Sequence, residues 1–79
     1  MPTAQIKGSI TQIIGVVVDI HFPETLPDLF TAAETTMPNG EKLVLEIQQH
    51  TGGNNVRAVA MSTTDGLERG QEIVSNNEP

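Results

Sequence analysis

The feature that most constrains this fold is an alternation of apolar and polar residues with a period of two. Between residues 16 and 22 every even position is apolar, whereas the odd positions include Asp19 and His21. Between residues 43 and 50 the odd positions 43, 45 and 47 are apolar, with Glu46 among the polar residues between them. Because successive side chains of a strand point to opposite faces, both segments are predicted to be half-buried strands with one face in water.

Four further segments predict strands less clearly. Residues 6–10 alternate, and Gly15 marks a sharp bend or bulge before the next strand. Residues 56–61 are apolar on both faces, as expected of a buried strand, and residues 72–74 supply a short final strand. Residues 30–36 fit either a strand or the start of a helix.

Turn residues separate these segments. Pro38-Asn39-Gly40 offers the Asn-Gly pair that is favoured where both turn residues need a positive φ. Pro23 and Pro27 delimit a polar connection between two predicted strands, and residues 51–55 are predicted to form a flexible loop. About six short strands between turns are typical of a small sandwich or barrel. Because closure removes exposed strand edges, we expect an all-β fold in the form of a small closed barrel.

Composition narrows the class of protein. The chain has 79 residues, so residues 1–79 are expected to form a single domain. It has no cysteine, only two aromatic residues and a net charge of -6, which argues against thiolate chemistry and nucleic-acid binding. The apolar run at residues 13–18 is far shorter than a membrane helix needs. With no secretory signal visible, a cytoplasmic location is expected.

The candidate chemical motifs are weak. Gly52-Gly53 is not followed by the Lys of a phosphate-binding loop, so it is interpreted as a hairpin loop. His21 and His50 are far apart in the sequence, and a zinc site would need a carboxylate such as Asp19 to join both. We therefore expect two solvent-facing histidines and no metal site.

The hypothesis that the chain is a small hydrolase is supported only by the presence of acidic residues and histidines. A catalytic carboxylate pair needs an apolar pocket, and a domain of this size is expected to lack a pocket of roughly 300 Å³. No Gly-x-Ser-x-Gly nucleophile motif is present. No catalytic residue is expected.

The segment "MSTTDGLERGQ", residues 61–71, is predicted to be a structured connection between strands. Asp65-Gly66 suits a tight turn, Leu67 is expected to pack back onto the core, and Gly70 supplies a second reversal. Arg69 and Asp65 are close enough in the sequence to pair, at a gain of only about 0–1 kcal/mol.

Two long segments together resemble the beta subunit of F-type ATP synthases. "GSITQIIGVVVDIHFP", residues 8–23, is similar to the family's opening Gly-x-Ile-x-x-Ile-Ile-Gly-x-Val-Val-Asp-Val-x-Phe-Pro. "KLVLEIQQHTGGNNVRAVAMSTTDGLERGQEI", residues 42–73, resembles its Leu-Val-Leu-Glu-Val-x-Gln-His-x-Gly, Val-Arg-x-Ile-Ala-Met and Asp-Gly-Leu-x-Arg-Gly. The alpha subunit lacks the last two motifs. The chain departs from the family at Ala33 and Thr35, where larger apolar residues are usual, and this predicts looser packing there.

The resemblance implies a six-stranded N-terminal barrel that alternates with barrels of alpha subunits in the crown of a hexamer. The parent complex makes ATP from ADP and phosphate with a transmembrane proton or sodium gradient, on the cytoplasmic face of a bacterial inner membrane. Its Mg-ATP/ADP site lies in a domain that would follow Pro79, so the chain is expected to be a fragment with no cofactor. The alternative is a stand-alone binding module resembling an OB-fold, which would need a basic or aromatic face.

Overall fold

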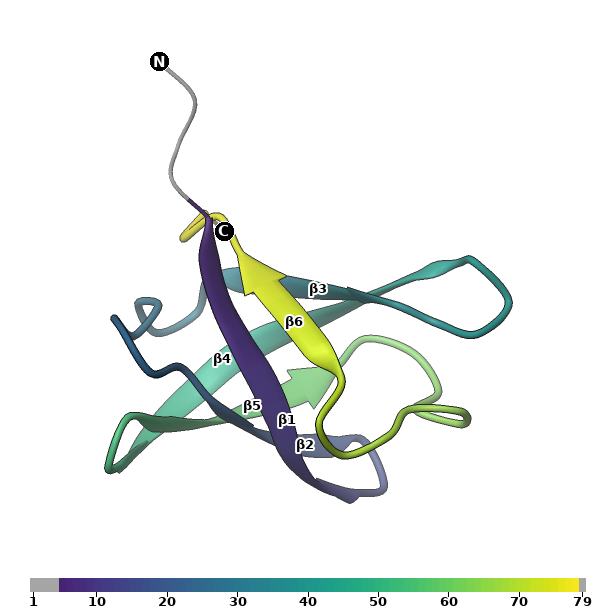
Figure 1. Ribbon diagram of the computed structural model, residues 1–79, viewed down its shortest axis with the longest axis horizontal. Helices are drawn as coiled ribbons and strands as arrows, with labels where there is room; N and C mark the ends of the chain where they lie inside the picture. The colour runs from purple at the N-terminus through teal and green to yellow at the C-terminus, as the bar shows by residue number, and fades with distance from the viewer. Residues whose placement is uncertain (1–4, 79) are drawn as a thin grey trace.

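The computed structural model describes residues 5–78, and these form a closed barrel of six antiparallel strands (Figure 1). Around the barrel the strands follow the order β1-β2-β5-β4-β3-β6, and β6 pairs with β1 to close it. The all-β closed barrel is therefore confirmed. The strands are β1 (Ile6–Ile14), β2 (Val17–His21), β3 (Ala32–Thr36), β4 (Lys42–Gly52), β5 (Asn55–Ala60) and β6 (Glu72–Ser75).

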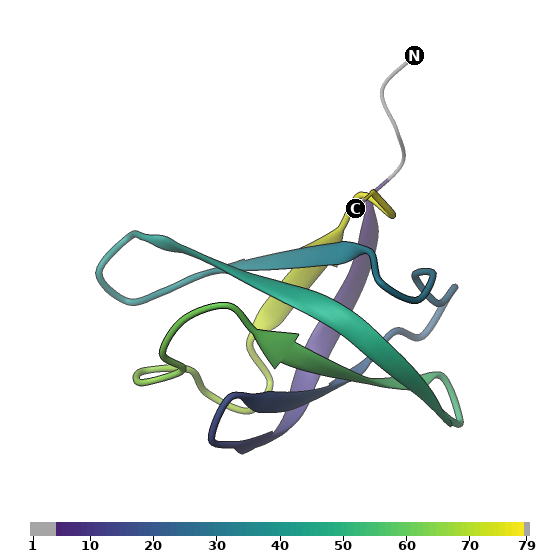
Figure 2. The same ribbon diagram turned by 180° about the vertical axis from the view of Figure 1, so that it is seen from behind.

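Two connections cross between strands that are not neighbours in the barrel. Residues 22–31 lead from β2 to β3, and residues 61–71 lead from β5 to β6 (Figures 1 and 2). The other strands are joined by short hairpins, so the order β2-β5-β4-β3 is a Greek-key arrangement. Residues 30–36, for which a helix was also considered, contain β3. Within residues 5–78 no helix is long and apolar enough to cross a bilayer.

The core follows the predicted alternation, with one exception. Val18, Ile20 and Phe22 are fully buried. Val16 continues the same pattern but is 47% exposed, because it lies in the turn between β1 and β2 and beyond the end of the barrel interior. The buried apolar residues form one cluster: Ile10, Val18, Ile20, Phe22, Ala33, Leu43, Leu45, Ile47, Val56, Ala58, Ala60 and Ile73.

The expectation that β5 is buried on both faces is wrong. Its inward positions are buried, but Arg57 and the following Met61 are exposed and Val59 is only half-buried. The reason is closure: a barrel has one interior, so the other face of every strand points outward. The outer apolar residues of β5 are therefore part of the molecular surface.

Two of the glycine-containing hairpin turns, β3–β4 and β4–β5, differ from their predicted forms. Asn39 does not have a positive φ; Gly40 does, at 88°, and its N–H donates to Met37 O over 2.9 Å. The pair with two positive φ values is Gly53-Asn54, at 61° and 63°. This is the combination of a type I′ turn, so the predicted flexible loop is a tight turn between β4 and β5.

The junction between β3 and β6 is the shortest of the barrel, with only two registered residue pairs, compared with five between β3 and β4. Side-chain hydrogen bonds reinforce it. Thr35 is 4% exposed, and its hydroxyl donates to Glu72 O over 2.7 Å, while Gln71 Nε2 donates to Thr35 Oγ1 over 2.7 Å. Ser75 Oγ donates to Ala32 O over 2.9 Å. Threonine at position 35, in place of a larger apolar residue, thus provides buried hydrogen bonds between β3 and the start of β6.

Candidate functional site

The segment 61–71 crosses one end of the barrel and is fastened to β1 (Figure 1). The N–H of Gly70 donates to Ile10 O over 2.7 Å, and the N–H of Ile10 donates to Gln71 O over 3.0 Å. The Thr64 hydroxyl donates to Gly15 O over 2.6 Å. Leu67 packs against the core, as predicted. The segment is thus a connection that hydrogen bonds hold against β1 and the β1–β2 turn.

Both predicted reversals in this segment are present. The N–H of Leu67 donates to Thr64 O over 3.0 Å, around Gly66 with a φ of 96°. The N–H of Gln71 donates to the carbonyl of residue 68 over 3.2 Å, around Gly70 with a φ of 87°. Both glycines occupy the turn position where a type II turn requires a positive φ. The N–H groups of Leu67, Gly70 and Gln71 are therefore engaged in the two turns and in the contact with β1.

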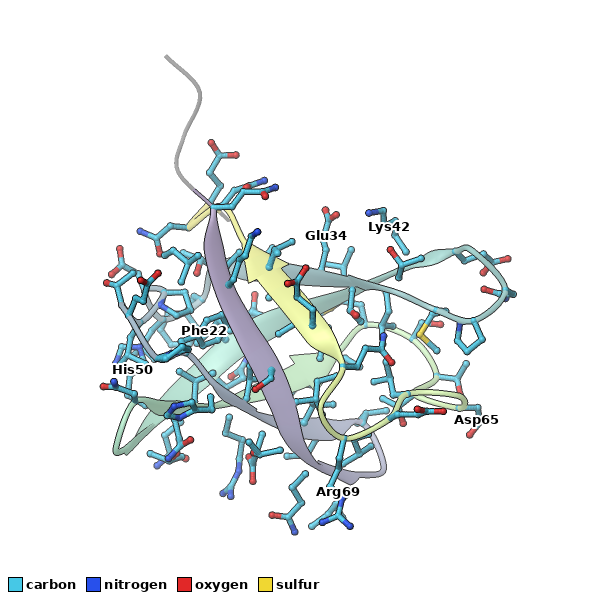
Figure 3. The ribbon with its side chains drawn as sticks, viewed as in Figure 1. Phe22, Glu34, Lys42, His50, Asp65 and Arg69 are labelled. Atoms are coloured by element: carbon cyan, nitrogen blue, oxygen red, sulfur yellow. The ribbon has the colours of Figure 1, made fainter. Side chains whose placement is uncertain are left out.

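The anticipated pairing of Asp65 with Arg69 does not occur. The two side chains point to different parts of the surface (Figure 3), and the salt bridge within residues 5–78 joins Arg57 to Asp19 instead, with an Nε–Oδ1 distance of 3.0 Å. The hydrogen bond and the charge of Asp19 raise the pKa of Arg57 above its usual value. This pair lies on the outer face, where β2 and β5 are adjacent.

A cleft of about 390 Å³ lies between segment 61–66 and the β3–β4 hairpin, so the expectation that no such pocket exists is wrong. It arises because the β3–β4 hairpin extends beyond the barrel and the loop lies beside it (Figures 1 and 2). Its charged lining residues Glu41, Lys42 and Asp65 are exposed. No carboxylate in the cleft has the apolar surroundings that a general acid needs, so the cleft does not support hydrolysis.

Gly52-Gly53 forms a hairpin turn, as predicted. Gly52 is paired with Asn55 across the turn, and Asn55 Nδ2 donates to Gly52 O over 2.9 Å. Because Asn54 Nδ2 also donates to Pro23 O over 3.1 Å, the polar groups of the turn contact the protein itself. A phosphate-binding loop would instead point successive N–H groups at a ligand.

The two histidines are bound to different partners. His21 Nδ1 lies 3.1 Å from Asn55 Oδ1, and His50 Nε2 lies 2.7 Å from Pro27 O. His50 is exposed as expected, but His21 is half-buried beside β5. Asp19, the acid that a shared metal site would need, pairs with Arg57. Among residues 5–78 no three His, Cys, Asp or Glu side chains are grouped as metal ligands.

The surface feature that the sequence interpretation missed is a set of apolar residues on the outer face of β1, β2, β5 and β4. The sequence does contain an indication of this surface, because residues 56–61 carry apolar side chains on both faces. The sequence interpretation explains the second face by burial. In the structure that face points outward and adjoins Ile14 and Val17. Predicting this apolar surface requires the identity of the neighbouring strands, which the barrel topology determines.

The barrel architecture agrees with the description of a known protein family. The family model described as ATP synthase alpha/beta family, beta-barrel domain, matches residues 10–77. The match includes β2 to β6 entirely and most of β1. Residues 5–78 contain this barrel and no catalytic domain. The chain belongs to the ATP synthase alpha/beta family and represents its beta-barrel domain.

Proposed function

We propose that this chain is the N-terminal barrel of an ATP synthase beta subunit and serves as an assembly domain. Membership of the family implies assembly with related subunits into a hexamer. The observation that carries the choice of beta is the pair of motifs at 56–61 and 65–70, which resemble those of beta subunits and lie in one continuous stretch of β5 and its following loop. In this role the barrel has alpha-subunit barrels as its neighbours in the crown.

The parent complex of this proposal makes ATP from ADP and phosphate with a transmembrane proton or sodium gradient. Its catalysis and Mg-ATP/ADP binding belong to a separate domain, and it works as a peripheral assembly on the cytoplasmic face of a bacterial inner membrane. The contacts of the 61–71 segment support a structural role for the barrel, because Gly66 and Gly70 form its two turns and the N–H groups of Leu67, Gly70 and Gln71 donate to carbonyls within the fold.

Nucleotide titration tests the assignment of catalysis to another domain. The 79-residue chain, labelled with ¹⁵N, is expected to show no saturable amide shifts when Mg-ATP is added. Shifts that saturate at micromolar Mg-ATP and map to the cleft beside Asp65 would contradict the proposal.

Association with the full-length alpha subunit from the same source tests the assembly role. Sedimentation velocity is expected to show a complex of the two proteins, whereas the chain alone remains unassociated at the same concentration. Absence of a complex at the highest soluble concentration would contradict the assembly role.

The alternative of an OB-like module for oligonucleotides finds no support in the surface chemistry. The chain has four Lys and Arg against ten Asp and Glu, and Arg57 is occupied by Asp19. A module of this kind needs a cationic groove with aromatic residues on which bases stack.

A further inference from the structure

We infer that the apolar outer face of β1, β2, β5 and β4 is the surface on which a companion barrel with cationic contact residues docks. This inference rests on the proposed assembly role and specifies which side of the barrel performs it. We call this surface the outer apolar band, and it consists of Ile14, Val17, Val44, Val59 and Met61.

The strand register makes these residues one continuous surface. Ile14 is paired with Val17 between β1 and β2, and Val17 is paired with Val59 between β2 and β5. The N–H of Met61 donates to Val44 O over 2.9 Å, which extends the surface to β4. Directly paired side chains on one face of a sheet lie close enough to touch. Four adjacent strands therefore contribute to a single apolar area.

The two ends of the band are strongly exposed apolar side chains. Ile14 is 64% exposed and Met61 is 58% exposed, although the interior of the barrel is filled by other residues. Val17 and Val59 are half-buried between them. Isolated exposed apolar residues are ordinary, but a contiguous group is typical of a surface that binds another protein.

The surface beside the outer apolar band is hollowed. A hollow of about 320 Å³ adjoins it, with a lining that includes Ile14 and Val17 and a polar border that includes the Asp19–Arg57 ion pair. An apolar floor with a polar border is the arrangement that receives an anchoring side chain at protein interfaces. We therefore expect the partner to insert an apolar side chain here.

Closure of the barrel determines the kind of contact. Each of the six strands is paired on both sides, so no free edge is available for a partner strand. A partner must instead contact the side chains on the outer wall. The outer apolar band offers such contacts without any change in the backbone.

Charge selects the partner. The chain carries a net charge of -6, and the band is bordered by the carboxylate of Glu46, which is paired in register with Val59. A second copy would bring the same negative charge to the contact, and like charges placed opposite each other oppose association. A related barrel with Lys or Arg around an apolar centre is the complementary surface.

The test measures binding of the 79-residue chain to the full-length alpha subunit from the same source. The double variant Ile14→Lys, Met61→Lys places two like charges in front of a cationic partner. The matched control is Leu29→Lys, which makes the same change at an exposed apolar residue of the β2–β3 connection, away from the band. Thermal unfolding by far-UV circular dichroism checks that both variants fold.

We expect the double variant to bind the alpha subunit at least tenfold more weakly and Leu29→Lys to bind like the wild type. Amide shifts of the ¹⁵N-labelled chain are expected around residues 14–17 and 59–61. Binding of wild type that the double variant leaves unchanged, or that Leu29→Lys weakens as much, would overturn the inference and leave the assembly role intact.

Two further outcomes separate the inference from the proposed function. If the wild-type chain does not bind the alpha subunit at all, the proposed assembly role fails and the inference fails with it. If the chain forms a homodimer that the double variant abolishes, the band is an interface between identical copies and the choice of a cationic partner is wrong.

Discussion

Gly8 shows how one residue sets the packing at the start of β1. A Cβ atom at this position would lie 2.7 Å from the Phe22 ring and 2.7 Å from the carbonyl oxygen of His21. Real Cβ atoms do not approach other atoms so closely, so either the ring or the backbone would have to move. Phe22 is fully buried and the largest side chain of the core. Glycine at position 8 therefore allows β1 to pass directly over the Phe22 ring.

The Gly8→Ala variant is expected to lower the free energy of unfolding by about 1–3 kcal/mol, because it overfills a packed core. Urea unfolding followed by far-UV circular dichroism measures this, and the chain has neither Trp nor Tyr for fluorescence. The control places the same change in a Phe22→Leu background, where the smaller side chain makes room. An equal loss in both backgrounds would show that the Phe22 ring is not the cause.

Among the elements, the junction between β3 and β6 depends most on side chains. Its two registered pairs are supplemented by the hydroxyls of Thr35 and Ser75 and by the amide of Gln71. Gln71 Nε2 also donates to Thr36 O over 2.9 Å. No side-chain polar atom buried among the described residues lacks a partner. The junction is thus held by a satisfied polar network inside an otherwise apolar wall.

Thr35→Val is expected to destabilise the barrel by about 1–2 kcal/mol, because it leaves Glu72 O and Gln71 Nε2 without their buried partner. Thr36→Val, on the exposed face of the same strand, is the matched control and should change stability far less. Hydrogen exchange of the Thr35→Val variant should accelerate first at Val74 and neighbouring β6 amides. Uniform acceleration over all strands would contradict a local role for the network.

The β4–β5 turn gives a second prediction for an element. Asn54 has a φ of 63° and its side chain donates to Pro23 O. Asn54→Gly removes the side-chain bond but suits the positive φ, whereas Asn54→Ala removes the same bond and keeps a Cβ in the left-handed region, at a cost of roughly 1–2 kcal/mol relative to glycine. Asn54→Ala should therefore unfold at lower urea than Asn54→Gly. Equal midpoints would argue against the type I′ geometry.

For the whole molecule, the pairing of the first strand with the last controls how the barrel forms. Ile6 is paired with Ser75 and Ser9 with Glu72, so nearly the full length of the chain must be brought together. Chains dominated by such non-local pairs fold slowly, because loop closure precedes the gain from pairing.

Refolding is therefore expected on the millisecond-to-second scale, as for other β-barrels. Stopped-flow circular dichroism after dilution from urea measures the rate. Complete refolding within microseconds would contradict a transition state that includes the β1–β6 pairing.

The parts of the fold that the sequence predicted are those set by local pattern. Alternation placed Leu45 and Ile20 in the core, because the period of a strand is visible within a few residues. Burial of Thr35 and exposure of Met61 were not visible, because they depend on which distant strand lies alongside. The ion pair was misplaced for the same reason: Asp19 and Arg57 are partners in the β2–β5 register and distant in the sequence.

The neighbouring positions of Ile6 and Ser75 also determine how the barrel responds to mechanical load. Because β1 and β6 are antiparallel, the chain enters β1 and leaves β6 at the same end of the barrel. Tension applied through these two points would peel the β1–β6 hydrogen bonds apart one after another, which needs far less force than shearing them all at once. In the proposed ring of barrels, side-wall contacts between neighbours would therefore supply the resistance to load that the β1–β6 pairing lacks.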